Sequence, residues 1–183
     1  MAISNGQQTS VADAMTIGFP GLLADGTNLK NCDSKYNAEA SAELPWGCGV
    51  VRHSSDEDNA VVKPHTSAAA AAPLFAGVLA HSHDYAPDIE VGTTGPKSKV
   101  TCSVLTHGRI YVLPEENVTP GDAVRMRVVT AGAEVAGKFR TTADGTDCIN
   151  LSKIARWVTT GSSTVPAILE IDLTGAADVA ADT

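Results

Sequence analysis

Aromatic and cationic residues are both scarce in this chain of 183 residues. Only 4% of its residues are Phe, Trp or Tyr, and 13 Lys and Arg stand against 21 Asp and Glu, a net charge of −8 at pH 7. A core must therefore consist mainly of Val, Leu, Ile and Ala, which leaves little material for a deep ligand pocket. The negative charge argues against binding to nucleic acid or to an anionic membrane, because both take their affinity from Lys and Arg.

Long apolar runs and paired cysteines are missing as well. No stretch approaches the roughly 18 apolar residues of a membrane span, and the first ten residues lack the charged and apolar regions of a signal peptide. We therefore expect a soluble protein that is not exported. Cys32, Cys48, Cys102 and Cys148 form no CxxC pair. This spacing argues against a zinc site or a redox motif and favours buried free thiols.

Composition divides the chain into three parts, within a length typical of one domain. Residues 1–45 are rich in Asn, Gln, Ser, Ala and Gly and contain a turn motif, Phe19-Pro20-Gly21, which predicts an irregular N-terminal arm with loops. Residues 46–173 are the predicted β-rich core domain, and residues 174–183 are a C-terminal tail.

Short apolar runs between turn residues indicate strands, and Gly and Pro recur too often for a long helical bundle. At most one helical turn is expected, at residues 67–72, and an acidic turn at residues 54–59. The pattern predicts about eight to ten strands, at residues 47–53, 61–63, 75–81, 100–104, 109–113, 124–128, 138–142, 149–151, 155–158 and 167–173. The predicted fold class is all-β, a small β-barrel or a jelly-roll-like sandwich with an irregular N-terminal arm.

Alternation within these strands predicts which side chains face inward. Val124, Met126 and Val128 alternate with Arg125 and Arg127, the pattern of a sheet with one wet face. The full predicted core is Val50, Val78, Leu79, Val104, Ile110, Val112, Val124, Met126, Val128, Trp157, Leu169 and Ile171. Pro120-Gly121 predicts a turn in which Gly121 adopts a positive φ.

The group of polar side chains most suggestive of a binding site is His81-Ser82-His83-Asp84. His81 and His83 lie on one side of a strand and could share a metal ion. A third ligand would come from His53, His65 or His107. The other interpretation is that the strand ends here, with His81 packed and a loop starting at His83, and we favour it because no acidic ligand cluster accompanies the pair.

Motifs of catalysis and cofactor binding are not found. The Asp-Gly sequences at residues 24–27 and 143–146 lack the remaining ligands of a calcium loop, and nucleophile elbows, P-loops and dinucleotide-binding glycines are absent from the sequence. The sequence therefore predicts no catalytic, cofactor-binding or metal residues, and a protein that is not an enzyme.

A series of short motifs follows one order along residues 45–173. They lie at residues 75–81, 92–95, 104–112, 118–124, 137–140, 155–157 and 167–173. Among them are Gly108-Arg109-Ile110, Pro120-Gly121-Asp122 and Ala155-Arg156-Trp157. In this order the chain resembles the structural cement, or head decoration, proteins of tailed bacteriophages.

The resemblance implies a structural protein of the virion, assembled in the host cytoplasm. It would sit on the outer surface of the capsid and bind several copies of the major capsid protein. Because a bridging protein gains avidity by oligomerising on a symmetric lattice, we expect a homo-oligomer, more a trimer than a dimer. The N-terminal segment, residues 2–31, is expected to lie on the major capsid protein. Two alternatives stay open: a tail or baseplate adaptor, and a small metal-binding β-barrel that uses His81 and His83.

Overall fold

The computed structural model describes residues 18–24, 30–65, 67–81, 94–132, 134–174 and 180–181, and their regular secondary structure is nearly all β. The strands are β1 (Asn31–Asn37), β2 (Gly49–His53), β3 (Asp56–Val62), β4 (Phe75–Ala80), β5 (Thr101–Val112), β6 (Arg125–Arg127), β7 (Phe139–Arg140), β8 (Cys148–Asn150), β9 (Ala155–Trp157), β10 (Ala167–Asp172) and β11 (Ala180–Ala181). The helix α1 (Ala68–Ala71) is a single turn, as predicted, and no helix within these ranges is long and apolar enough to cross a membrane.

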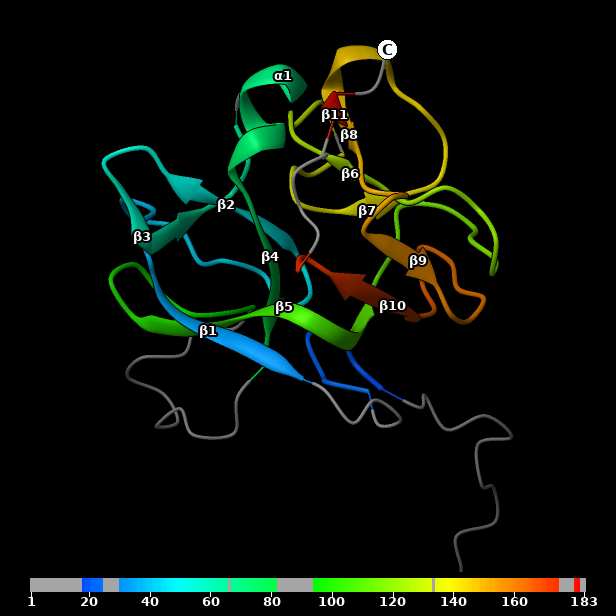
Figure 1. The fold of residues 1–183 in the computed structure, drawn as a ribbon, viewed down its shortest axis with the longest axis horizontal. Coiled ribbons are helices and arrows are strands. Elements are labelled where there is room, and N and C mark those ends of the chain that lie inside the picture. Colours follow the sequence, from blue (N-terminus) through cyan, green and yellow to red (C-terminus); the bar gives the residue numbers. More distant parts are fainter. Residues whose placement is uncertain are drawn as a thin grey trace, which may run out of the picture.

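Five strands close into a barrel, in the order β1-β3-β2-β4-β5 (Figure 1). The ring closes because β1 pairs with β5 in antiparallel register from Asn31 to Tyr36 and with β3 in parallel register at Tyr36 and Asn37. Closure gives the first strand of the ring a partner on both sides, and this protects it from pairing with other chains. The predicted all-β fold, in its barrel form, is confirmed.

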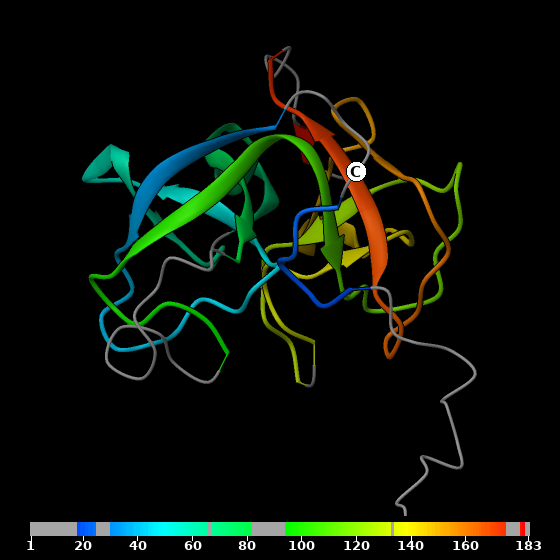
Figure 2. The ribbon, with the colours of Figure 1, turned by 90° about the horizontal axis from the view of Figure 1, so that it is seen from below.

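Strand β5 continues beyond the barrel and organises the rest of the molecule. Its first half pairs with β1 and β4, and from His107 to Val112 it pairs with β10, which in turn pairs with β9. Figure 2 shows β5 running beside β1 and then beside β10. We predicted two strands here, with a break near Gly108. The break is absent because Gly108, at φ +135°, stays in the ladder opposite Ile171.

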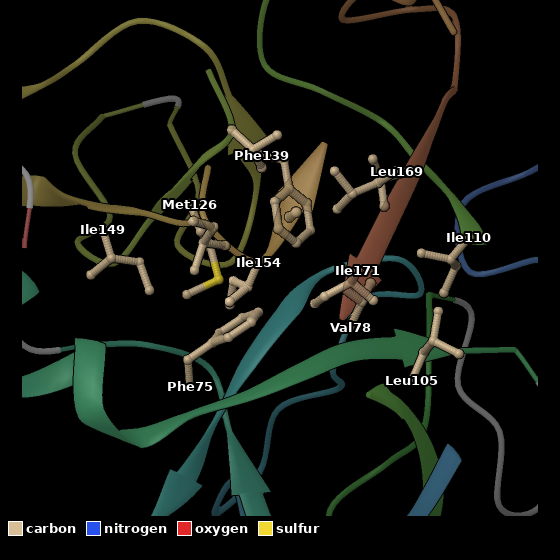
Figure 3. Close-up of a cluster of buried hydrophobic side chains, with 14 of the residues drawn as sticks. Phe75, Val78, Leu105, Ile110, Met126, Phe139, Ile149, Ile154, Leu169 and Ile171 are labelled. Atoms are coloured by element: carbon tan, nitrogen blue, oxygen red, sulfur yellow. The ribbon is translucent and has the colours of Figure 1, made fainter. Parts of the chain in front are cut away.

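A second sheet, in the order β11-β8-β6-β7, packs against this assembly. The larger core cluster lies between them, and Figure 3 shows Phe75 of β4 pointing toward Met126 of the second sheet. A smaller cluster is the barrel interior, because its members come from four strands of the ring: Val50, Val61, Ala76, Leu79, Cys102 and Val104, with Leu44 and Cys48 from the preceding loop. All twelve predicted core residues are buried.

Two segments differ from the sequence prediction. Strand β1 lies inside the part predicted to be irregular, and its first four residues are exposed, so the strand lacks the alternation that predicts one. Its backbone bonds to β5 hold it instead. The acidic run expected as a turn at residues 54–59 begins strand β3 at Asp56, because a tight turn at Ser54 and Ser55 places Asp56 opposite His53.

Cys48, Cys102 and Cys148 are buried, as expected, and form no disulfide, whereas Cys32 is exposed. Burial raises the pKa of Cys48 and of Cys102 to about 12. Neither thiol therefore ionises near neutral pH, which makes a redox role at these positions chemically unfavourable.

Candidate functional site

His81, the first residue of the predicted metal pair, directly follows β4 and lies between two aromatic rings. Its ring centroid is 5.1 Å from that of Phe19 and 4.9 Å from that of Trp46, both in edge contacts. Its backbone N–H donates to the carbonyl of Gly21 at 2.7 Å. The strand therefore ends here with His81 packed, as the favoured interpretation of the sequence predicted.

The other histidines of the metal hypothesis are engaged elsewhere. His53 Nδ1 lies 2.8 Å from Ser55 Oγ, and His65 Nδ1 lies 2.9 Å from the Lys63 carbonyl oxygen. His107 Nδ1 lies 3.1 Å from the Asp172 carboxylate. In the ranges that the structure describes, no three His, Cys, Asp or Glu side chains form a group that could hold a metal. His83 lies outside those ranges, so the pair itself stays a prediction.

Arg127 of β6 is a fully buried guanidinium held by three carboxylates. Its Nε lies 3.0 Å from Glu115 Oε1, and its Nη2 lies 2.7 Å from Glu134 and 2.8 Å from Asp144. Burial alone would lower the pKa of Arg127, but the carboxylates outweigh it and raise that pKa above its ordinary value. Burial raises the pKa of Glu115 although Arg127 acts in the opposite direction.

This ion cluster fixes three loops around the second sheet. Glu115, Glu134 and Asp144 belong to different connections, and Arg140 of β7 adds a contact of 3.1 Å to Asp144. The predicted wet face of β6 is thus wrong for Arg127, because loops that are distant in the sequence fold over it. The cluster determines the surface shape, since each carboxylate that neutralises the guanidinium also positions its own loop.

An apolar groove lies beside His81. It forms where the hairpin at residues 131–137, on the connection between β6 and β7, meets the turn at Phe19-Pro20-Gly21. Its volume is about 340 Å³. Its lining is mainly apolar and comes from Phe19, Pro20, Pro45, Trp46, Gly47, Cys48, Thr94, Leu113, Val135, Ala136 and Lys138. Phe19 is 42% exposed at the rim, so a large aromatic surface is open to solvent. Exposed apolar surface of this kind is typical of an interaction site.

A second hollow, of about 330 Å³, lies over β1 to β5 and has a mixed lining of charged and apolar residues. Asp33, Lys35, Arg52 and Glu57 contribute side chains of both signs, and the Lys35 ammonium donates to the Asp58 carbonyl. Charges of both signs in a solvated hollow largely neutralise one another. We therefore regard the apolar groove as the better candidate for a functional surface.

Comparison with known proteins identifies the family. The family described as "Structural cement protein (E217 gp24/Pam3 gp6)" matches residues 7–174, which include nearly all the described fold. The chain belongs to the structural cement protein family. The resemblance seen in the motif order is thereby confirmed for this cement protein.

A solved structure supports the fold of the cement protein. A chain in the structure entitled "The capsid of Myoviridae Phage XM1" superimposes with a TM-score of 0.63 at 16% sequence identity, over 94% of this chain and 98% of that chain. At this identity the likeness concerns the fold alone. No curated protein matches the chain.

Sequence reasoning missed both the groove and the ion cluster. The groove combines residues 19–20, 45–48, 113 and 135–138, which no local pattern connects. Phe19-Pro20-Gly21 was predicted as a turn, and Gly21 does adopt a positive φ of +89°. Its partner is Gly47, at φ +73°, and a Cβ on Gly47 would lie 2.8 Å from the Gly21 nitrogen. These glycines let two distant turns approach each other and so build the groove wall.

Proposed function

We propose that this cement protein is a capsid decoration protein that binds the outside of a phage head and stabilises contacts between major capsid subunits. The main support for this proposal is the family match, because it spans residues 7–174 rather than one motif. We further propose that it acts by binding alone, without catalysis, on the outer surface of the virion capsid.

The architecture suits such a role because the surface is fixed before binding. The barrel is closed, and the Arg127 cluster holds three loops of the second sheet. A binding partner that is already ordered loses less conformational entropy on docking than one whose loops must be ordered. A protein that occupies many equivalent lattice sites benefits from this saving at every site.

The proposed partners are the major capsid protein and further copies of the chain itself, in a trimer rather than a dimer. The N-terminal segment is proposed to lie on the major capsid protein. Most of residues 2–31 lie outside the described ranges, but residues 18–24 belong to the fold. Gly21 donates to the Tyr111 carbonyl at 2.8 Å, and Leu23 forms a bridge with Ile110 of β5. A truncation that tests the segment should therefore remove residues 2–17.

The proposal is tested with heads that lack this protein. Purified full-length chain is added in increasing amounts, unbound protein is removed by sedimentation, and the bound copies are counted against the major capsid protein. We expect saturation at a simple ratio to the capsid subunits and extra density on the outer surface in cryo-electron microscopy. Density on the tail or baseplate instead would support the adaptor alternative and overturn the proposal.

The role of the segment and the oligomeric state are tested with the same material. The chain without residues 2–17 should keep its thermal unfolding temperature and require a higher concentration to saturate heads. Equal saturation would show that the segment is not the anchor. Light scattering of the full chain in solution should give the mass of a trimer, and a monomer mass would remove that part of the proposal.

A further inference from the structure

The apolar groove between Phe19, Trp46 and Val135 is shaped for contact with another chain. The rim residue Phe19 exposes 42% of its surface, and Val135 and Leu113 are half-buried at its walls. Aromatic side chains next to an apolar depression are the usual centre of binding energy in protein interfaces. The groove therefore offers an anchor position at the boundary of the barrel and the second sheet.

Ring contacts and backbone hydrogen bonds hold the groove walls in place. The ring of His81 lies between those of Phe19 and Trp46, and the backbone N–H of Trp46 donates to the Thr94 carbonyl at 3.0 Å. On the opposite wall, Gly137 donates to the Arg127 carbonyl at 2.8 Å and thus ties the 131–137 hairpin to the sheet. A preformed groove of this kind favours a partner that inserts a side chain.

One charge accompanies the apolar lining, and its sign selects the occupant. Lys138 lines the groove, and no carboxylate in the described ranges lies within ion-pair distance of its ammonium. The positive charge of Lys138 acts to lower the pKa of Glu115, but the Glu115 carboxylate makes its ion pairs with Arg127 and Arg140. A partner segment that is apolar and carries one Asp or Glu would therefore be complementary.

We propose that this groove receives an apolar segment of the major capsid protein that carries a carboxylate for Lys138. This inference rests on the proposed function. The position also agrees with the proposed N-terminal anchor, because the chain enters the described fold at Gly18, next to the groove rim.

The test measures binding of groove variants to heads that lack the protein. Phe19→Ala and Val135→Asp should weaken head binding about tenfold or more, since they remove an aromatic anchor and place a charge in the apolar wall. Val165→Asp is the matched control, because Val165 is 54% exposed on the β9–β10 connection, away from the groove lining. It should bind heads as the natural chain does. Thermal unfolding of each variant verifies the fold.

The charge is tested separately. Lys138→Gln should weaken binding about threefold at low salt and make it less sensitive to added salt, because a rim charge acts through screened attraction. If the natural chain binds heads but Phe19→Ala and Lys138→Gln bind equally well, the groove proposal is overturned and the proposed function stands. If the natural chain itself does not bind heads, the proposed function fails. A groove variant that changes only the oligomeric state would assign the groove to self-contact and also overturn the inference.

Discussion

At the scale of single residues, the buried guanidinium of Arg127 is the most sensitive point of the second sheet. Replacing it with methionine keeps much of the side-chain volume but leaves Glu115 without its closest positive partner. Removing one partner of a buried ion pair strands the other charge, so Arg127→Met should lower the free energy of unfolding by about 3–5 kcal/mol in urea titrations.

Arg156→Met is the matched control for this prediction. Arg156 also contacts a carboxylate, Glu170, at 2.6 Å, but its side chain is 69% exposed. An exposed pair contributes little, so this variant should change stability by less than about 1 kcal/mol. If the two variants were equally stable, the Arg127 cluster would not hold the loops as described.

A second residue-scale prediction concerns Gly121, whose φ is +98° as the turn motif predicted. No atom lies within 4 Å of the position a Cβ would take, so backbone strain is the only cost of a side chain here. Gly121→Val should reduce stability by roughly 1 kcal/mol or more. Gly121→Asn should cost less, because Asn tolerates a positive φ. Thermal melts of both variants provide the measurement, and equal melting temperatures with the natural chain would contradict the turn.

The exposed face of β10 makes a third prediction, on acid stability. Hydrogen bonds from Thr174 and contact with His107 lower the pKa of Asp172 from 3.8 to about 2. A carboxyl with a lowered pKa in the folded state stabilises the fold above its unfolded pKa and loses this effect as the pH falls through the folded value. Stability should therefore decrease between about pH 4 and pH 2, and less steeply in Asp172→Asn.

The pKa of Glu170, on the same face, is shifted in the same direction as that of Asp172. Burial raises its pKa, but hydrogen bonds from Arg109 and Arg156 outweigh burial and lower the pKa below its ordinary value. The comparison of Asp172→Asn with the natural chain in urea at a series of pH values isolates the Asp172 contribution from that of Glu170. Parallel curves for the two proteins would refute the prediction.

At the scale of elements, the pairing of β4 with β5 depends on Gly77. Its φ is +136°, and a Cβ would lie 2.3 Å from the carbonyl oxygen of Leu105 on the neighbouring strand. Gly77→Ala should therefore cost about 2 kcal/mol or more, since backbone strain and a clash with backbone add together. Gly121→Ala carries strain alone and is the control. A smaller loss for Gly77→Ala than for Gly121→Ala would contradict the tight approach of the two strands.

Element prediction from the sequence succeeded where buried apolar residues mark the strand. Strand β10 alternates buried apolar residues with acidic ones, and β4 is an unbroken buried run, so the existence of both strands and their buried residues could be predicted. Strand β1 could not, because Asn31, Cys32, Asp33 and Ser34 are all exposed and only backbone bonds with β5 make them a strand. Pairing with a distant strand determines the secondary structure of such a segment, and its local β-propensity does not indicate that pairing.

At the scale of the whole molecule, the candidate site lay beyond sequence reasoning for the same reason. The family resemblance pointed to a capsid role, but the groove arises only when the turns at Gly21 and Gly47 meet and the 131–137 hairpin closes beside them. Likewise, the alternation that placed Met126 inside also placed Arg127 outside. Only the three loops that cover Arg127 make it a buried residue.

Thiol accessibility provides a prediction for the whole fold. Cys48, Cys102 and Cys148 are buried, whereas Cys32 is exposed. A thiol-alkylating reagent at neutral pH should therefore modify Cys32 in the native protein and all four cysteines in denaturant, as counted by mass spectrometry. Rapid modification of Cys102 under native conditions would show that the barrel opens easily.

The continuity of β5 has a mechanical consequence. This strand crosses from the barrel to β10 without a loop, so a pull that separates the two parts is carried by covalent backbone through Gly108. A pull directed along β5 loads the hydrogen bonds on either side of the strand in parallel, so they break together rather than one after another. In the capsid role proposed above, each copy would offer this resistance to separation of its two parts. The force needed to unfold the protein should therefore depend on the length over which β5 is paired. Force spectroscopy can compare the unfolding force of the natural chain with that of a variant whose β5 is shortened at Val112.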